Sequence, residues 1–190
     1  MASTINSTTS SGVVITSDNT GSLALQSAGT TIATISSTGL TMNSGNIVQA
    51  SGAAPAFSAY RSTNQTPTTN TWTKIQLNVE EFDTNSNFDS TTNYRFTPTV
   101  AGYYEVSALI DLGGAGVSFV LGGIYKNGSL AKYIGGQTTT TEAYINGGYL
   151  FSMNGSTDYL ELYVYITATT PTVYAGSTAV SFSGFLARSA

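Results

Sequence analysis

The sequence predicts an all-β protein, and three observations lead to this prediction. Only 8% of the 190 residues are charged, against about 25% in a typical soluble domain. Thr, Ser, Asn and Gly take the place of the charged residues; Thr favours strands, whereas Ser, Asn and Gly favour turns. The apolar residues alternate with polar ones in the longer runs, and no window has the spacing of an amphipathic helix.

The clearest alternation is in residues 159–166, which predict a strand with two different faces. One face carries only aliphatic side chains, and the other carries Tyr159, Glu161, Tyr163 and Tyr165. Residues 102–110 alternate in the same way. Residues 72–79 predict a further strand, whose apolar face carries Ile75, Leu77 and Val79.

Turn signals separate these runs. Asn127-Gly128 and Asn154-Gly155 each lie between two strand-like segments. Both dipeptides predict hairpin turns, because Gly readily adopts a positive φ. Residues 113–116, which contain three glycines, and Pro171 in a Thr-rich stretch predict loops.

The composition changes sharply near residue 53, which predicts an N-terminal segment at 1–52 and a domain at 53–190. All aromatic residues lie from Phe57 onward. Before it, short β-prone pieces follow glycines at 12–16, 21–25, 29–35, 39–42 and 45–48. These pieces have too few aliphatic side chains to form a separate core, because a chain below about 40 residues rarely folds by itself. We expect a stem completed by two further copies or by another protein; a disordered Ser/Thr-rich leader is the alternative.

The composition also excludes several classes of function. Without His or Cys, no Ser-His-Asp or Cys-His site, thiolate chemistry or disulfide is available. The six basic residues are scattered, which argues against nucleic-acid binding. There is neither a membrane-spanning apolar run nor a signal peptide, so we expect synthesis in a cytoplasm. We expect no enzyme activity, no catalytic residues, no cofactor and no metal ion.

One acidic cluster is a candidate metal site. Glu80, Glu81, Asp83 and Asp89 carry the hard oxygen ligands that Ca²⁺ prefers. The cluster lacks the spacing of a calcium loop, and solvated loop charge is the favoured interpretation. Glycoside hydrolysis needs only two suitably separated carboxylates, and the sequence does not give that separation.

Four short segments in a fixed order carry a family resemblance. They are Pro55–Arg61, Phe88-Asp89 leading into Tyr94–Tyr104, Ile124–Gly128 and Ser181–Leu186. Together they resemble the C1q-like domain of the C1q and tumour-necrosis-factor superfamily. The resemblance implies a ten-strand jelly roll with Tyr104, Val106 and Ala108 facing the core, and it implies a homotrimer. The residues expected at the trimer interface are Tyr60, Tyr103, Tyr163, Tyr165 and Gly184.

A second resemblance concerns residues 15–31, which are similar to segments of structural proteins of tailed bacteriophages. With the first, it predicts a trimeric virion surface protein that decorates the capsid as a head fibre. Residues 1–50 would contact the major capsid protein or another virion protein. The aliphatic residues expected to make that attachment are Val14, Ile15, Leu23, Leu25, Ile32, Ile35 and Leu40.

Two other functions remain open. A tail-fibre tip would bind a host surface polysaccharide, through the Tyr-bearing strand face or the Thr-rich loops. A non-viral soluble lectin or ligand of C1q type is the third possibility, and the missing secretion signal counts against it.

Overall fold

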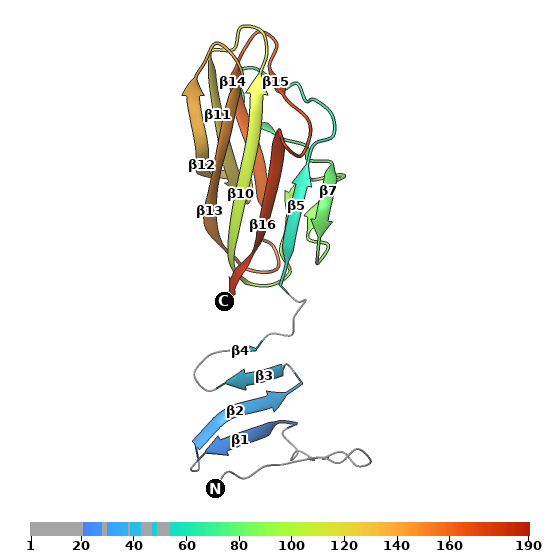
Figure 1. Cartoon of the computed structure of the whole chain (residues 1–190), viewed down its shortest axis with the longest axis vertical. Coiled ribbons are helices and arrows are strands. Elements are labelled where there is room, and N and C mark those ends of the chain that lie inside the picture. Colours follow the sequence, from blue (N-terminus) through green and yellow to red (C-terminus); the bar gives the residue numbers. More distant parts are fainter. Residues whose placement is uncertain (1–20, 28–29, 38, 43–46, 49–53) are drawn as a thin grey trace. The chain divides into compact units, whose positions relative to one another are not determined.

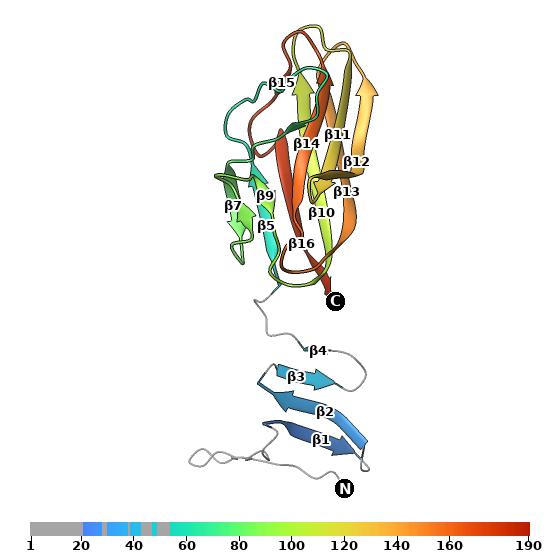
Figure 2. The same ribbon diagram turned by 180° about the vertical axis from the view of Figure 1, so that it is seen from behind.

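The structure is a computed structural model, which describes residues 21–27, 30–37, 39–42, 47–48 and 54–190 (Figures 1 and 2). The chain divides into two compact units, Met1–Ala53 and Ala54–Ala190, called here the N-terminal unit and the head. Every regular element in the described residues is a β-strand, so the all-β prediction is confirmed. The described residues include no helix that is long and apolar enough to cross a membrane.

The N-terminal unit is an antiparallel sheet of neighbouring strands. In order they are β1 (Leu23–Ser27), β2 (Thr30–Ser36), β3 (Gly39–Met42) and β4 (Ile47–Val48). Four of the five β-prone pieces are therefore strands, and the piece at 12–16 lies outside the described residues. Leu23 pairs with Ile35 and Leu25 with Ala33, which brings these four residues to one face of the sheet.

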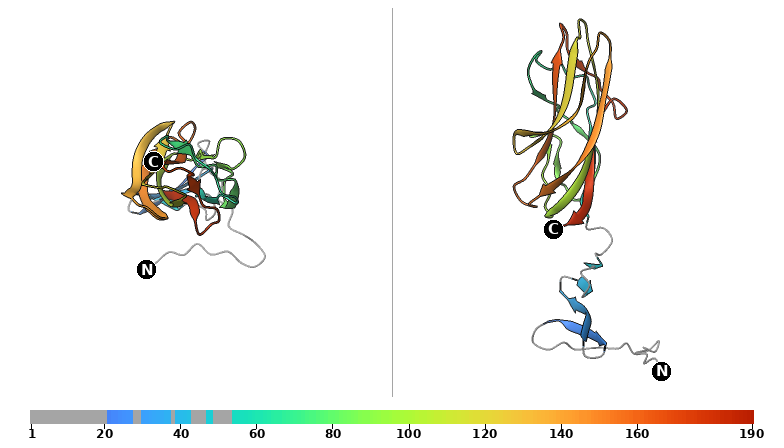
Figure 3. Two further views of the ribbon diagram at one scale, coloured as in Figure 1. Left: turned by 90° about the horizontal axis from the view of Figure 1, so that it is seen from above. Right: turned by 90° about the vertical axis from the view of Figure 1, so that its left-hand side faces the viewer.

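The head is a sandwich of two antiparallel sheets, seen from the side in the right panel of Figure 3. The first, called the β10 sheet, has the order β13 (Ala143–Met153), β10 (Gly102–Gly113), β16 (Val180–Ser189), β5 (Ala56–Tyr60) and β7 (Val79–Asp83), with β15 (Thr172–Val173) paired to β10. The second, called the β14 sheet, has the order β12 (Ser129–Thr138), β11 (Phe119–Lys126), β14 (Leu160–Thr167), β9 (Arg95–Phe96) and β8 (Phe88–Asp89), with β6 (Thr73–Lys74) paired to β14. Two five-stranded paths make the ten-strand jelly roll that the sequence predicted.

The core lies between the two sheets. Tyr104, Val106 and Ala108 of β10 are buried, as expected. The aliphatic face of β14 is buried against them. Phe57 of β5 joins the sheets: its ring stacks on Phe96 at a centroid distance of 4.2 Å and on Phe88 at 5.3 Å. Aromatic pairs of this kind add about 0.5–1.5 kcal/mol each beyond the area they bury.

The prediction of one continuous strand over 72–79 was wrong. β6 ends at Lys74 and pairs with β14, whereas β7 begins at Val79 and pairs with β5 in the other sheet. Residues 75–78 carry the chain from one sheet to the other. Ile75 and Leu77 are buried on the way, so their apolar alternation reflects a crossing through the core.

The two Asn-Gly turns have different outcomes. Asn127 and Gly128 have φ angles of 53° and 78° and join β11 to β12, which are paired, so this hairpin is confirmed. Asn154-Gly155 joins β13 to β14, which belong to different sheets. That turn is a sheet-to-sheet crossing, and the hairpin prediction was wrong because the local Asn-Gly signal does not specify which sheet receives the next strand. Of the predicted loop at 113–116, Gly113 is the last residue of β10 and residues 114–116 follow the strand, and Pro171 lies between β14 and β15.

Candidate functional site: the outer faces of the two sheets

The outer face of the β10 sheet carries large apolar side chains that no described residue covers. Strand alternation turns Tyr103 outward while Tyr104 is buried. Leu150 of β13 and Phe185 of β16 lie on either side of Glu105 in the strand register. This surface, called the apolar face, comprises Phe82, Tyr103, Tyr144, Leu150 and Phe185, each between 47% and 61% exposed. A cluster of this kind is typical of an interaction surface.

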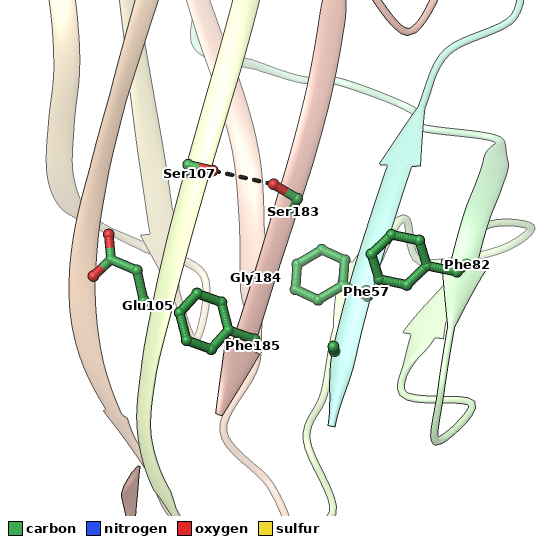
Figure 4. Close-up of a pocket in the computed structure, with 8 residues that line it drawn as sticks. Phe57, Phe82, Glu105, Ser107, Ser183, Gly184 and Phe185 are labelled. Carbon is green, nitrogen blue, oxygen red and sulfur yellow. Dashed lines mark hydrogen bonds between the residues drawn. The ribbon is translucent and has the colours of Figure 1, made fainter. Parts of the chain in front are cut away.

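A hollow of about 220 Å³ lies within the apolar face, between Phe82 and Phe185 (Figure 4). Its wall includes Ser107 and Ser183, whose hydroxyls are hydrogen-bonded at 3.1 Å. Gly184 also lines the hollow and exposes only backbone atoms there. A Cβ there would lie 2.7 Å from Cγ1 of Val106 and 3.0 Å from Cε1 of Phe57, so core packing on the other side of β16 requires the glycine.

The outer face of the β14 sheet is aromatic instead. Trp72 precedes β6, and its ring centroid lies 5.8 Å from Tyr125, 6.0 Å from Tyr133 and 5.9 Å from Tyr165. Tyr165 continues to Phe119 at 6.3 Å. Tyr125 also stacks on Tyr163 at 3.9 Å. Rings from β11, β12 and β14 thus form one connected surface around a single indole.

The cations on the β14 sheet all have partners. Lys74 lies 2.6 Å from Glu161 and Lys126 2.9 Å from Asp158. The hydrogen bond from Lys126 holds the pKa of Asp158 below its usual range. The Arg95 guanidinium lies 4.3 Å from the centre of the Tyr159 ring, and the Lys132 ammonium 5.5 Å from that of Tyr149.

A pair of carboxyl groups that the sequence analysis missed lies where β10 and β13 meet β15. Asp111 is only 6% exposed, and its side chain lies beside Glu142 and Tyr144. Burial, and then the charge of Glu142, raise the pKa of Asp111 to about 6. Thirty residues of sequence lie between the two acids. The sequence carried no signal, because Ile110, Asp111 and Leu112 continue the apolar–polar alternation; only the structure shows that the end of β10 is buried on both faces.

The acidic cluster at 80–89 serves the turns around it. Asp89 accepts hydrogen bonds from the backbone N–H groups of Thr92, Thr91 and Asn93. These hydrogen bonds lower the pKa of Asp89. Asp83 accepts the N–H of Phe88 at 2.6 Å. The four carboxylates of the cluster all accept hydrogen bonds, from Ser90, Ser58, Phe88 and Thr92 in turn. Within the described residues, no group of three or more acids is arranged to hold a metal ion.

The five residues predicted at the trimer interface are divided by the fold. Tyr60 and Tyr103 lie on the outer side of the β10 sheet, and Gly184 lies in the same sheet facing the core. Tyr163 and Tyr165 lie on the β14 sheet, on the other side of the sandwich. The apolar residues that sequence reasoning missed are Phe82, Leu150 and Phe185. They follow the strand alternation, but their face is assigned only by the pairing of β7, β13 and β16.

The predicted attachment residues lie in the N-terminal unit. Leu25 and Ile35 are exposed, whereas Ala33 beside them is buried. Leu23 is half-buried in β1. Ile32 lies in β2, and Leu40 pairs with Ile35 from β3. Val14 and Ile15 lie outside the described residues.

Solved structures share this fold. A crystal structure of murine APRIL at pH 8.5 matches with a TM-score of 0.53 at 6% identity, over 70% of this chain and 98% of that chain. Eiger TNF from S. frugiperda matches with a TM-score of 0.54 at 10% identity, over 72% and 94%. No protein-family model and no curated protein matches the sequence. The head is therefore a TNF-like jelly roll, and the structural likeness establishes the fold alone.

Proposed function

We propose that the head assembles as a homotrimer through the apolar face of the β10 sheet, and that the trimer is a structural protein on the surface of a tailed-phage virion. The observation that carries the proposal is the gathering of Phe82, Leu150 and Phe185 on one face of a TNF-like jelly roll. Burial of such side chains contributes about 25 cal/mol per Å². In a charge-poor chain, an uncovered face of this kind would lead to indiscriminate association.

The virion part of the proposal is supported by the N-terminal unit. Residues 15–31 resemble structural proteins of tailed phages. Leu25 and Ile35, 41% and 44% exposed, give β1 and β2 an apolar surface for the major capsid protein or another virion protein. The protein would thus decorate the capsid as a head fibre, with the N-terminal unit attaching it and the head projecting.

The proposed role is not enzymatic. The chain has no His and no Cys, so the common nucleophile–base pairs are unavailable. Asp111 and Glu142 form an acid pair in which Asp111 is buried. A buried acid whose pKa is raised by burial and by a neighbouring acid fits a structural role at the end of β10.

A second candidate function is supported by the aromatic face of the β14 sheet. Exposed Tyr and Trp rings are suited to host glycans, as a tail-fibre tip would require. Capsid decoration remains the first candidate, because the exposed Leu25 and Ile35 give the N-terminal unit a surface for attachment.

Two measurements test the proposal. Light scattering of the full chain is expected to give three times the mass of one chain. Gold-labelled antibody against residues 55–190 is expected to label the heads of intact virions. A monomer in solution contradicts the assembly, and labels confined to the tail replace capsid decoration with the tail-fibre role.

A further inference from the structure

We propose that the outer face of the β14 sheet is a binding site for a neutral polysaccharide chain. The site consists of an aromatic strip, formed by Trp72, Tyr133, Tyr165 and Phe119, and of a hydroxyl-lined hollow at its end. It rests on the proposed function in one respect: the trimer buries the apolar face of the β10 sheet and leaves this opposite face open.

The rings of the strip follow one another across the sheet. Tyr133 lies 6.0 Å from Trp72, Trp72 lies 5.9 Å from Tyr165, and Tyr165 lies 6.3 Å from Phe119. Tyr125 meets the indole edge to face, and Tyr163 stacks on Tyr125. The planes of neighbouring rings are inclined to one another by 45°, 57° and 69°, so the strip is a twisted series of apolar surfaces that an extended chain of sugar residues can follow.

Gly123 sets the indole close to the sheet. A Cβ at this position would lie 2.7 Å from Cδ1 of Leu130 and 3.2 Å from Cζ3 of Trp72. Glycine weakens a strand interior, and here its position in β11 makes room for the Trp72 ring. The ring is consequently half-buried and fixed on the sheet surface, which lowers the entropic cost of binding a ligand.

The chemistry of the strip distinguishes it from the apolar face. Tyr133 and Tyr165 carry hydroxyls and Trp72 an indole N–H, so these side chains combine an apolar ring with a hydrogen-bonding edge. A pyranose has the matching combination of a C–H face and a rim of hydroxyls. On the apolar face, three of the five exposed side chains, Phe82, Leu150 and Phe185, have no polar atom, which suits a contact between subunits.

Charge argues for a neutral ligand. All four cations of this sheet among the described residues, Lys74, Arg95, Lys126 and Lys132, are engaged by an acid or an aromatic ring. Lys74 and Lys126 are neutralised by acids, and Lys132 pairs with the buried Ile124, which places it on the opposite side of β12 from Tyr133. An uronic acid or a sulfated sugar would therefore gain little over its neutral counterpart.

The hollow lies at the Phe119 end of the strip. It has a volume of about 300 Å³ and is lined by Ser118, Thr138, Thr139 and Thr140. Thr138 pairs with Phe119 in the register of β11 and β12, which sets the hydroxyls beside the last ring. Neutral hydroxyls donate and accept hydrogen bonds as sugars do, so the hollow fits the continuation of the same chain.

The test uses the full chain and its single tryptophan. Because Trp72 is the only Trp, its fluorescence reports on the strip. The protein is titrated with dextran, mannan, galactan and laminarin, and with alginate as an anionic comparison. We expect a saturable change in emission with at least one neutral polysaccharide and no tighter binding of alginate.

Variants locate the site. Tyr133→Ala removes a ring that is 54% exposed and is expected to weaken binding at least fivefold. Tyr144→Ala, on the outer face of the β10 sheet and 59% exposed, is the matched control and is expected to bind as the wild type does. Unchanged binding by Tyr133→Ala, or no response to any of the four neutral polysaccharides, overturns the proposal.

Light scattering on the same samples separates this proposal from the proposed function. A monomer that binds the polysaccharide refutes the trimer and leaves the site standing. A trimer whose emission responds to none of the neutral polysaccharides refutes the site and leaves the assembly standing.

Discussion

The Nζ atom of Lys74 lies 2.6 Å from the carboxylate of Glu161, whose residue is only 4% exposed. The two residues belong to neighbouring strands, β6 and β14. Lys74 also donates a hydrogen bond to the carbonyl of Asn93 at 3.1 Å. A two-residue strand thus supplies the countercharge for a buried acid.

Removing this countercharge is expected to destabilise the head. Lys74→Met leaves Glu161 buried and unpaired, which costs about 3–5 kcal/mol. The measurement is the free energy of unfolding in urea. The double variant Lys74→Met/Glu161→Leu replaces the pair by apolar side chains and is expected to recover most of the loss. A double variant as unstable as the single one would show that Lys74 acts through packing.

The head is expected to lose stability as the pH rises through about 6. In the folded state the pKa of Asp111 is raised to about 6, first by burial and then by Glu142. The folded state therefore binds the proton more tightly than the unfolded chain. The stabilisation is complete below the unfolded pKa, near 3.8, and disappears above the folded one.

This pH dependence is measured as the free energy of unfolding at pH 5 and pH 7.5. Asp111→Asn carries no charge at either pH, so the difference between the two values should shrink. An unchanged difference in Asp111→Asn would assign the effect to another group. Asp89 and Asp158 cannot produce this loss of stability at rising pH. Their pKa values are lowered in the folded state, so their contribution to stability is lost as the pH falls.

Gly184→Leu is expected to prevent folding of the head. The new side chain would enter the space between Val106 and Phe57, where even a Cβ lies within 3.0 Å of both. Overpacking of a core typically costs about 1–3 kcal/mol, and backbone contacts raise the cost here. Circular dichroism and thermal unfolding measure the effect, with Ser181→Ala on the outer side of β16 as control. A stable, folded Gly184→Leu head would contradict the packing described for β16.

Charges on the apolar face are expected to separate the trimer without unfolding the head. Phe185 and Leu150 are 53% and 61% exposed, so Phe185→Lys/Leu150→Lys disturbs no core contact. The expected mass in light scattering is that of one chain, with an unchanged circular dichroism spectrum. Tyr133→Lys on the β14 sheet should stay trimeric. If it becomes monomeric and the double variant does not, the interface uses the β14 sheet.

Deletion of residues 1–53 is expected to leave a folded trimeric head that no longer attaches to virions. The head has its own core and shares no strand with the N-terminal unit. The measurement is the amount of head protein that sediments with purified particles lacking it. Within the full chain, Leu25→Asp/Ile35→Asp should reduce attachment in the same way. Full occupancy by the truncated head would refute the proposed role of residues 1–50.

Much of the fold was predictable because strand periodicity is a local property. The alternation in 159–166 identified the buried face of β14, and the positive φ available at Asn127-Gly128 identified one hairpin. The order of the four short segments along the chain was sufficient to identify the jelly-roll resemblance. In the structure, Phe57, Phe96 and Tyr104 from these segments meet in one aromatic core.

Sheet membership was not predictable, because it depends on pairing between distant segments. Residues 72–79 alternate like a strand, yet their two ends pair with β14 and β5 in different sheets. For the same reason the sequence grouped Tyr103 with Tyr163, which lie on opposite sides of the sandwich. Asp111 and Glu142 could be linked only by the β10–β13 register.

The sequence by itself thus determined the strand class, the inward-facing residues and the absence of His and Cys chemistry, since these depend on residue type and on a two-residue period. The tertiary structure alone decided which exposed aromatics share a surface. It separated the apolar face of the β10 sheet from the aromatic strip of the β14 sheet, because long-range strand pairing assigns each outward side chain to its sheet. β7, β13 and β16 belong to the first sheet, and β11, β12 and β14 to the second.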